Sequence, residues 1–266
     1  MRGVDEVQND KCYYLPEMTW PEFAKAIPGV KLAIIPVGSH EQHGPHGTFQ
    51  FDTAGSREFS ILLGKRLYPK AVVAPVVPVG MSGHHMRFPG TITLQAETLV
   101  SVLMDMALSL TKHGIRSFLF ANGHGGNIPA LTIVTNRLRQ DHDLDAMWAT
   151  LPYDAAGDVY GRYVTSPVNG HSCEGEVSVM LHLLPEAVRT EALTPGDLNP
   201  AYVEGLKNGV PVKVGQFFDE VTLNGALGDA TKASPEIGKA IVEAALEKLV
   251  PYLERKMGSM AEETNG

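Results

Sequence analysis

The sequence predicts a single-domain α/β protein, a three-layer α/β/α arrangement around a mostly parallel central sheet. Three short apolar runs, at residues 31–37, 71–79 and 117–121, are each followed at once by a loop-forming residue. Such runs are typical of buried parallel strands that end in loops. With 266 residues and 44% hydrophobic content, the chain can bury one sizeable core, so we expect residues 1–266 to form one domain.

Helical patterns separate these strands. Apolar residues recur at three- and four-residue spacing in the segments 54–67, 96–113 and 128–139. The alternation of strand and helix predicts a parallel sheet covered on both faces.

The second half of the chain continues the alternation less regularly. We expect a strand at 145–151 and a helix at 176–184 that Pro185 ends. Gly, Pro and Asn are frequent in 190–229, which predicts loops and short hairpins. A last amphipathic helix is expected at 235–256, with a frayed tail at 261–266.

Composition excludes several classes of protein. A net charge of −8 argues against nucleic acid as the main partner, because that partner requires clustered Lys and Arg. No apolar run approaches the roughly 20 residues that span a bilayer, and the polar N-terminus is unlike a signal peptide, so we expect a cytoplasmic protein without a membrane partner. Cys12 and Cys173 are the only cysteines, too few for a disulfide framework or a cysteine zinc site.

Histidines and carboxylates gather in the loop after the first strand. Residues 38–46 read Gly-Ser-His-Glu-Gln-His-Gly-Pro-His, and Asp52 follows. In an extended segment Glu41 and His43, two apart, point the same way and could share a cation. The alternative is a polar loop that solvates the strand end, with Asp52 or Thr53 as N-cap of the helix near Ala54.

Three further loops carry similar residues. Residues 80–91 include His84 and His85, where surface histidines and a simple turn are the alternative. Residues 122–127 read Asn-Gly-His-Gly-Gly-Asn; a phosphate nest competes here with a metal ligand, although the spacing matches no phosphate-binding fingerprint. Residues 169–176 contain His171, Glu174 and Glu176, whose carboxylates could instead only favour a helix dipole.

Together, four loops that follow strands supply imidazoles and carboxylates. Ligands in open α/β sheets bind beyond the carboxyl ends of strands, so these loops are expected to converge. Nitrogen and oxygen ligands without thiolate suit Zn, Mn or Fe(II).

The four motifs, in this order, resemble the creatininase family of amidohydrolases over roughly residues 31–180. The resemblance implies two divalent metal ions: Glu41 and His124 would bind one, His43 and Glu174 the other, and Asp52 would bridge them. His171 would carry protons. It also implies a homohexamer.

One departure affects the ligand set. Creatininase has a carboxylate ligand two residues after the His of the third motif, where this chain has Gly126. We therefore assign Glu174 as the fifth ligand, with Glu176 as the second choice or as a catalytic partner that orients a ligand.

Other departures concern the substrate. Ser172, Cys173 and Val177 replace the usual Ala, Gly and Thr of the fourth motif, and the chain has only two tryptophans to enclose creatinine. We expect a hydrolase that cleaves a C–N bond in a small, cyclic amide, lactam or formamide through a metal-activated water. The substrate-binding groups would be Ser82, His85 and the backbone N–H groups of Gly125 and Gly126.

Three alternatives stay open. The same scaffold could cleave a C–C bond in a cyclic keto-inositol of the 3-dehydro-scyllo-inosose type. Cys173, at a helix start near His171, could be the nucleophile of a cysteine hydrolase. A non-catalytic phosphate- or nucleotide-binding protein could use residues 122–127, but it would leave Glu41, His43 and Asp52 unexplained.

Overall fold

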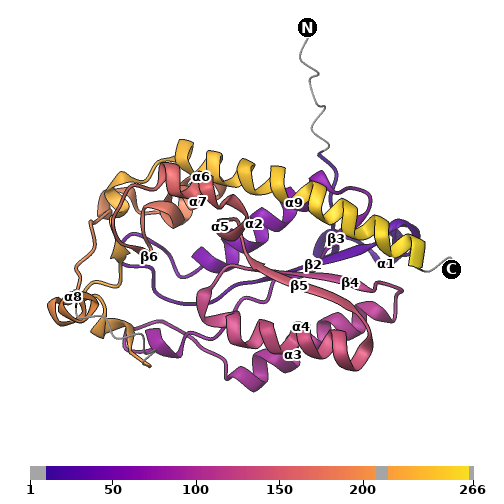
Figure 1. Ribbon diagram of the computed structural model, residues 1–266, viewed down its shortest axis with the longest axis horizontal. Helices are drawn as coiled ribbons and strands as arrows, with labels where there is room; N and C mark the ends of the chain where they lie inside the picture. The colour runs from indigo at the N-terminus through magenta and orange to yellow at the C-terminus, as the bar shows by residue number, and fades with distance from the viewer. Residues whose placement is uncertain (1–9, 208–214, 264–266) are drawn as a thin grey trace, which may run out of the picture.

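The computed structural model describes residues 10–207 and 215–263. A five-stranded parallel sheet with the order β1-β3-β2-β4-β5 forms the middle layer (Figure 1). Its strands are β1 (Tyr13–Tyr14), β2 (Leu32–Val37), β3 (Ala71–Val73), β4 (Ser117–Asn122) and β5 (Asp145–Thr150). The mostly parallel three-layer α/β/α fold is confirmed.

Helices cover both faces of the sheet. The helices are α1 (Trp20–Ala26), α2 (Phe51–Arg66), α3 (Ala96–Thr111), α4 (Ile128–His142), α5 (Tyr153–Ala156), α6 (Asp158–Tyr163), α7 (Glu174–Leu183), α8 (Pro200–Lys207) and α9 (Pro235–Glu263). In Figure 1, α3 and α4 lie below the sheet, while α2, α7 and the long α9 lie above it.

The alternation of side chains along β2 explains why its sequence is apolar throughout. The apolar cluster between the sheet and helices α3 and α4 includes Ala33, Ile35 and Val37. The cluster between the sheet and helices α2 and α9 includes Leu32 and Ile34. A strand buried on both faces requires apolar residues at every position. Burial of these two clusters is the main source of stability.

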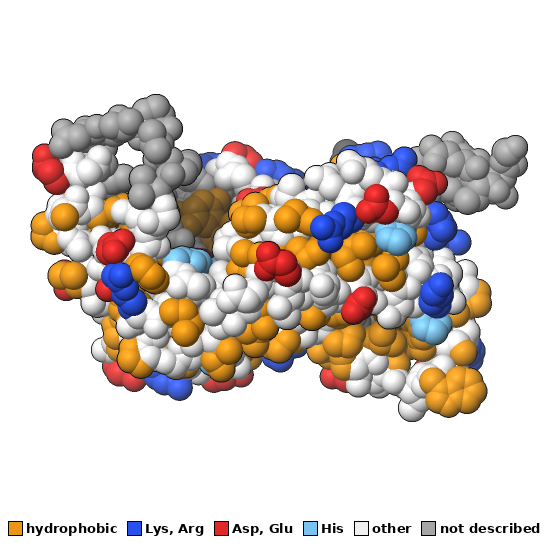
Figure 2. All heavy atoms as spheres, turned by 90° about the horizontal axis from the view of Figure 1, so that it is seen from below, with side chains coloured by type: hydrophobic (Ala, Val, Ile, Leu, Met, Phe, Trp, Pro, Cys, Tyr) orange, Lys and Arg blue, Asp and Glu red, His pale blue; other side chains and the backbone are white. Residues whose placement is uncertain are grey.

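The face formed by α3 and α4 is shown in Figure 2. Lys and Arg side chains lie scattered among acidic and apolar ones on this face. Among the helices of the described residues, none combines the length and the apolar character that crossing a membrane requires.

Four predicted strand boundaries differ from the structure. The first strand begins at Leu32 and the strand expected at 117–121 ends at Asn122, each one residue from expectation. The strand expected at 71–79 ends at Val73, because Pro75 and Pro78 lack the N–H group that a ladder needs; only Val77 forms a further bridge, to Val37. The strand expected at 145–151 ends at Thr150.

Helix boundaries also differ from expectation. The first long helix begins at Phe51, so Gln50 is its N-cap and Asp52 lies in the first turn, which rules out the capping role considered for Asp52 and Thr53. The helix expected at 176–184 begins at Glu174. The last helix continues through Pro251 to Glu263, beyond its expected end at residue 256. Of the tail 261–266 that was expected to fray, residues 261–263 are helical and residues 264–266 lie outside the described residues.

The segment expected to form loops and hairpins contains little regular structure. It holds α8, the 3₁₀ turn η7 (Phe218–Glu220) and β7 (Leu227–Gly228), and β7 pairs antiparallel with β6 (Asn169–His171). Residues 208–214 of this segment lie outside the described residues.

Candidate metal centre

The candidate site lies at the carboxyl ends of β2 and β4. The chain turns from β2 to its neighbour β3 on one side and from β4 to β5 on the other, so the loops after β2 and β4 separate at this point of the sheet. Such a switch point is where open α/β sheets bind ligands. The loop after β2 supplies Glu41 and His43, and the loop after β4 supplies His124.

Most of the predicted site residues meet here. Among the described residues, three sets of side chains bring possible ligand atoms within 4.8 Å of one another. These sets are Glu41, Asp52 and His124; His43, His171 and Glu176; and Glu41, His85 and His171. All are nitrogen and carboxylate oxygen donors, which suit Zn, Mn or Fe(II).

His43 and His124 each use one ring nitrogen to bind a backbone carbonyl and direct the other at carboxylates. His43 Nδ1 donates to the Glu41 carbonyl at 3.2 Å, and His124 Nε2 donates to the Met81 carbonyl at 3.1 Å. Because a carbonyl only accepts, these bonds fix each ring, and the other nitrogen faces the acidic groups. His43 Nε2 lies 3.0 Å from Asp52 Oδ1, and His124 Nδ1 lies 3.0 Å from Glu41 Oε1.

A proton or a metal ion is needed where these atoms face one another. Glu41 Oε1 and Asp52 Oδ2 are buried and have no hydrogen-bond partner among the described residues. Lone pairs of nitrogen and carboxylate oxygens directed at one another repel unless a proton or a metal ion lies between them. The donor set therefore fits divalent metal ions.

The pKa values indicate which interactions stabilise this cluster when no metal is bound. Burial lowers the pKa of His43 and of His124, but Asp52 and Glu41 respectively raise each of them to about 9. Burial by itself would raise the pKa of Glu41, yet His124, His171 and His85 bring it well below its usual value. In the metal-free protein, protons therefore occupy the positions that cations would take.

Gln42 organises two more histidines, a role that sequence reasoning missed. Its side-chain oxygen accepts from Gly44 N at 2.9 Å and its amide nitrogen donates to Gly225 O at 3.1 Å, which fixes the amide orientation. The same nitrogen donates to His85 Nδ1 at 2.9 Å, so the proton of His85 is on Nε2. The position of Gln42 between two predicted ligands was the available signal.

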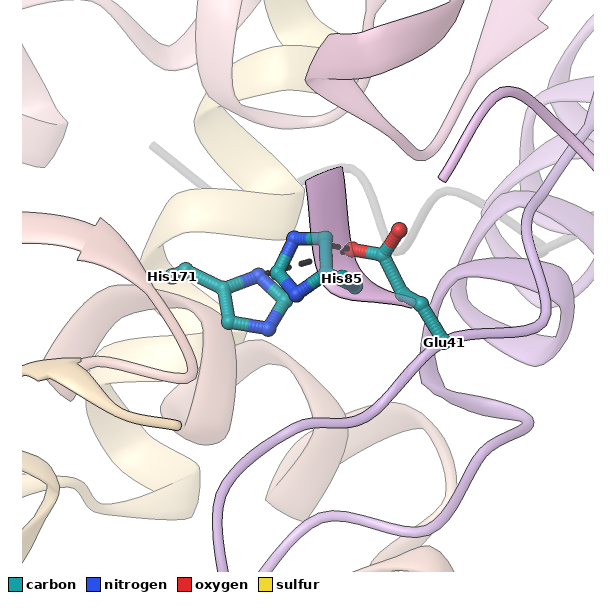
Figure 3. A group of neighbouring side chains, drawn as sticks. All are labelled: Glu41, His85 and His171. Carbon is teal, nitrogen blue, oxygen red and sulfur yellow. Dashed lines mark ion pairs between the residues drawn. The ribbon is translucent and has the colours of Figure 1, made fainter. Parts of the chain in front are cut away.

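His171 has the same Nε2–H tautomer as His85 but turns its other nitrogen, Nδ1, to the centre. Its Nε2 donates to the Gln42 carbonyl at 2.7 Å, which leaves the lone pair on Nδ1. Both rings approach Glu41 Oε1, with His85 Nε2 at 3.5 Å and His171 Nδ1 at 3.6 Å (Figure 3). Burial lowers the pKa of His85 to about 3, and burial together with His43 lowers the pKa of His171 well below its usual value, so both rings are neutral.

The structure separates the two acidic residues that open α7. Glu174 Oε2 accepts from Thr165 N at 2.9 Å, and from Ser166 N and Oγ at 2.8 and 2.7 Å, and it lies outside the ligand sets. Glu176 joins His43 and His171 instead. Residues two apart on a helix point about 200° apart, so only one can face the centre.

The placement of Glu174 thus differs from the first choice of the sequence analysis. The resemblance alone does not determine which of two carboxylates within one helical turn faces the centre. Burial raises the pKa of Glu176 to about 7, while His43 opposes the increase.

The predicted substrate-binding groups lie in different places. Ser82 is fully buried and donates to Glu41 Oε2, so it supports a candidate ligand. Gly125 is exposed at the start of the turn η4 (Gly125–Asn127), and Gly126 packs against His124. His85 lies in the turn η3 (Gly83–His85) at the edge of the cluster.

The surroundings of Cys173 disfavour a reactive thiolate, although the residue is the N-cap of α7. It is buried beside Tyr160, and burial, followed by Glu176, raises its thiol pKa to about 11. A thiolate is the nucleophilic form, so this environment disfavours the cysteine hydrolase alternative.

A three-layer parallel α/β fold with imidazoles and carboxylates clustered at its switch point is typical of metal-dependent enzymes. The family model described as "Creatininase: Creatinine amidohydrolase" matches residues 16–253, and the chain belongs to this creatininase family of metal-dependent hydrolases. The predicted resemblance is confirmed.

Individual relatives have different activities. A mycofactocin precursor peptide peptidase of Mycobacterium tuberculosis is 34% identical over 236 residues, which cover 84% of this chain and 85% of the relative. A 3-dehydro-scyllo-inosose hydrolase of Thermotoga maritima is 28% identical over 274 residues, covering 94% and 84%. The solved structure "Creatininase Mn" superposes with a TM-score of 0.73 at 25% identity, covering 93% of this chain and 99% of the other.

Proposed function

We propose that this protein hydrolyses a C–N bond of an amide with two divalent metal ions. The observation that carries the proposal is the pair of fixed imidazoles whose second ring nitrogens face Glu41 and Asp52. Glu41 and His124 would hold one ion, His43 and Glu176 the other, and Asp52 would lie between them because it approaches both histidines. Bound divalent ions supply Lewis acidity and lower the pKa of a coordinated water.

The residues of the chain would orient the substrate and move a proton. His171 presents the lone pair of Nδ1 to the centre and is neutral, so it can accept a proton and pass it to the leaving nitrogen. His85 presents Nε2–H, which can donate to a substrate carbonyl. The backbone N–H groups of Gly125 and Gly126 remain candidates for the same task.

The activities of the relatives suggest a substrate class to test. The similarity to a peptide peptidase makes a linear peptide amide the first substrate to test, ahead of the small cyclic amides expected from sequence. The cytoplasm remains the expected location.

Purified protein loaded with Mn²⁺ or Zn²⁺ should be assayed with short peptides, lactams, cyclic ureas and formamides. Release of an amine from one of these, abolished by EDTA and restored by metal, is the expected result. A metal-loaded protein without activity on any amide would contradict the proposal.

A second candidate is C–C bond hydrolysis of a cyclic ketone, supported by the similarity to the inosose hydrolase. Adding 3-dehydro-scyllo-inosose to the same panel separates the two. Ring opening of this ketone without any amine release would favour the second candidate.

The role of His171 has its own test. His171→Ala should keep the metal content of the wild type and lower kcat by about 10²- to 10⁴-fold, the range typical of a general acid–base group. Glu41→Ala should lose metal and activity together. Loss of metal in His171→Ala would instead make His171 a ligand.

A further inference from the structure

A segment that we call the strap, residues 217–226, packs against the candidate metal centre. The ring centroid of Phe218 lies 4.2 Å from that of His85 and 4.9 Å from that of His171. At the other end of the strap, Gly225 O accepts from Gln42. The strap therefore contacts the same histidines that Gln42 orients.

Arg87 anchors the strap from the loop that carries His85. Its guanidinium lies 3.7 Å above the ring of Phe217, and its Nη1 lies 3.2 Å from both Asp219 Oδ1 and Glu220 Oε1. Contacts on both sides of Phe218 thus hold its backbone in place. Aromatic stacking of a guanidinium and pairing with two carboxylates suit arginine and not lysine.

The far half of the strap is held as well. Thr222 Oγ1 lies within hydrogen-bond distance of Asp197 O and Ala226 O, at 3.0 and 2.9 Å, and Leu223 N donates to Asp197 O at 2.7 Å. Leu223 itself points to solvent with 58% of its surface exposed. Specific contacts therefore hold both halves of the strap. Phe218 contacts the histidines of the centre, whereas Leu223 faces solvent.

Phe218 is an apolar ring against polar groups. Its ring lies edge-on to His171 and is tilted at 32° to His85, and neither arrangement supplies a hydrogen bond. An apolar wall beside the candidate metal centre excludes water and strengthens the electrostatic interactions within the centre.

We propose that Phe218 is the apolar wall of the substrate pocket: it shields the metal pair from water and packs against an apolar substrate group next to the scissile amide. Arg87 acts as a positioning residue through Phe217, Asp219 and Glu220. The shielding depends only on metal binding, whereas the substrate preference rests on the proposed function.

Metal release tests the shielding. The full-length protein is loaded with Zn²⁺ and mixed with excess EDTA, and the rate of Zn²⁺ loss is followed. Phe218→Ala should release Zn²⁺ about threefold to tenfold faster, the range that loss of an aromatic contact gives. Leu223→Ala, on the same strap, should match the wild type. Equal rates for Phe218→Ala and the wild type would overturn the shielding.

Arg87→Gln provides a second variant should Phe218→Ala fail to fold, because Arg87 is partly exposed and lies outside the ligand sets. It should release Zn²⁺ faster than the wild type at unchanged metal content. A wild-type release rate in a folded Arg87→Gln protein would show that the strap does not control access.

Kinetics test the substrate preference. Two peptide amides that differ only in leucine or glycine next to the scissile bond are compared. Phe218→Ala should lower kcat/KM for the leucine substrate about tenfold, mainly through KM, and change the glycine substrate little. An equal loss on both overturns the preference. Absence of amide hydrolysis by the wild type would contradict the proposed function and this preference, and the metal-release comparison would still decide the shielding.

Discussion

His43 and His124 share one arrangement at the scale of single residues. Each ring donates one N–H to a backbone carbonyl and turns its other nitrogen to a buried carboxylate. A backbone carbonyl cannot change its protonation, so it fixes the tautomer more firmly than a titratable partner would. The two rings are thereby prepared to bind cations.

This arrangement predicts how the stability of the metal-free protein depends on pH. The folded-state pKa of both histidines is raised from 6.5 to about 9. A raised folded-state pKa contributes stability that is fully present below the unfolded pKa and is lost as pH rises through the folded pKa. We therefore expect the metal-free protein to lose stability between pH 6.5 and 9.

The metal-loaded protein should lose less stability over the same range, because the ions replace the protons. Thermal unfolding with EDTA and with added metal measures both curves. Metal affinity should also increase with pH up to about 9. A Tm of the metal-free protein that rises between pH 6.5 and 9 would contradict this account.

The two acidic residues of α7 should respond differently to the same substitution. Glu176→Gln should lower the metal content, because Glu176 lies beside His43 and His171. Glu174→Gln should keep the metal and lower the free energy of unfolding by about 1–3 kcal/mol, because a buried carboxylate with three hydrogen bonds is weakened. Metal analysis and denaturant unfolding of the two variants measure this; the reverse pattern would restore Glu174 as the ligand.

Sequence reasoning could identify the residue types of the site but not every position. Glu41, His43 and His124 belong to loops whose strands are evident, Asp52 opens the helix that follows the first of these loops, and the structure brings them together. The choice between Glu174 and Glu176 depends on where a helix starts, which periodicity determines only to within a few residues. Phe218 lies in a segment without periodicity, so only the folded chain shows its contact with His85.

At the scale of elements, the parallel sheet and the helices over it followed from continuous apolar runs and helical spacing. The errors arose where prolines end a run, as at Pro75, and where a helix continues through a proline, as at Pro251. Pro251 is tolerated in α9 because packing of the helix on the sheet and on α7 outweighs the loss of one backbone hydrogen bond.

The turn after β4 also offers a matched test. A Cβ atom at Gly126 would overlap His124 Nε2 and Met81 O, whereas one at Gly125 would meet no described heavy atom within 4 Å. Gly126→Ala should therefore weaken metal binding about 10- to 100-fold, as loss of a bond that orients a ligand does. Gly125→Ala should bind metal like the wild type. Metal titration of both variants measures the difference, and equal affinities would show that the ring of His124 adapts.

At the scale of the whole molecule, the loops after β2, β3 and β4 lie at one edge of the central sheet, where the strands end, and β6 and the start of α7 complete the centre. Large clusters of apolar residues on both sides of the sheet hold this edge in place. The homohexamer implied by the family resemblance stays a prediction, which sedimentation velocity of the metal-loaded protein would check.

The most direct test of the central claim is the metal content of the wild type beside that of Asp52→Asn after dialysis against Mn²⁺ or Zn²⁺. Asp52 approaches both fixed histidines, at 3.0 Å from His43 and 3.4 Å from His124. We predict about two ions per chain in the wild type and about one or none in Asp52→Asn, as expected for a carboxylate shared by two metal ions. Equal metal content in the two proteins would contradict the claim that this carboxylate joins two metal sites.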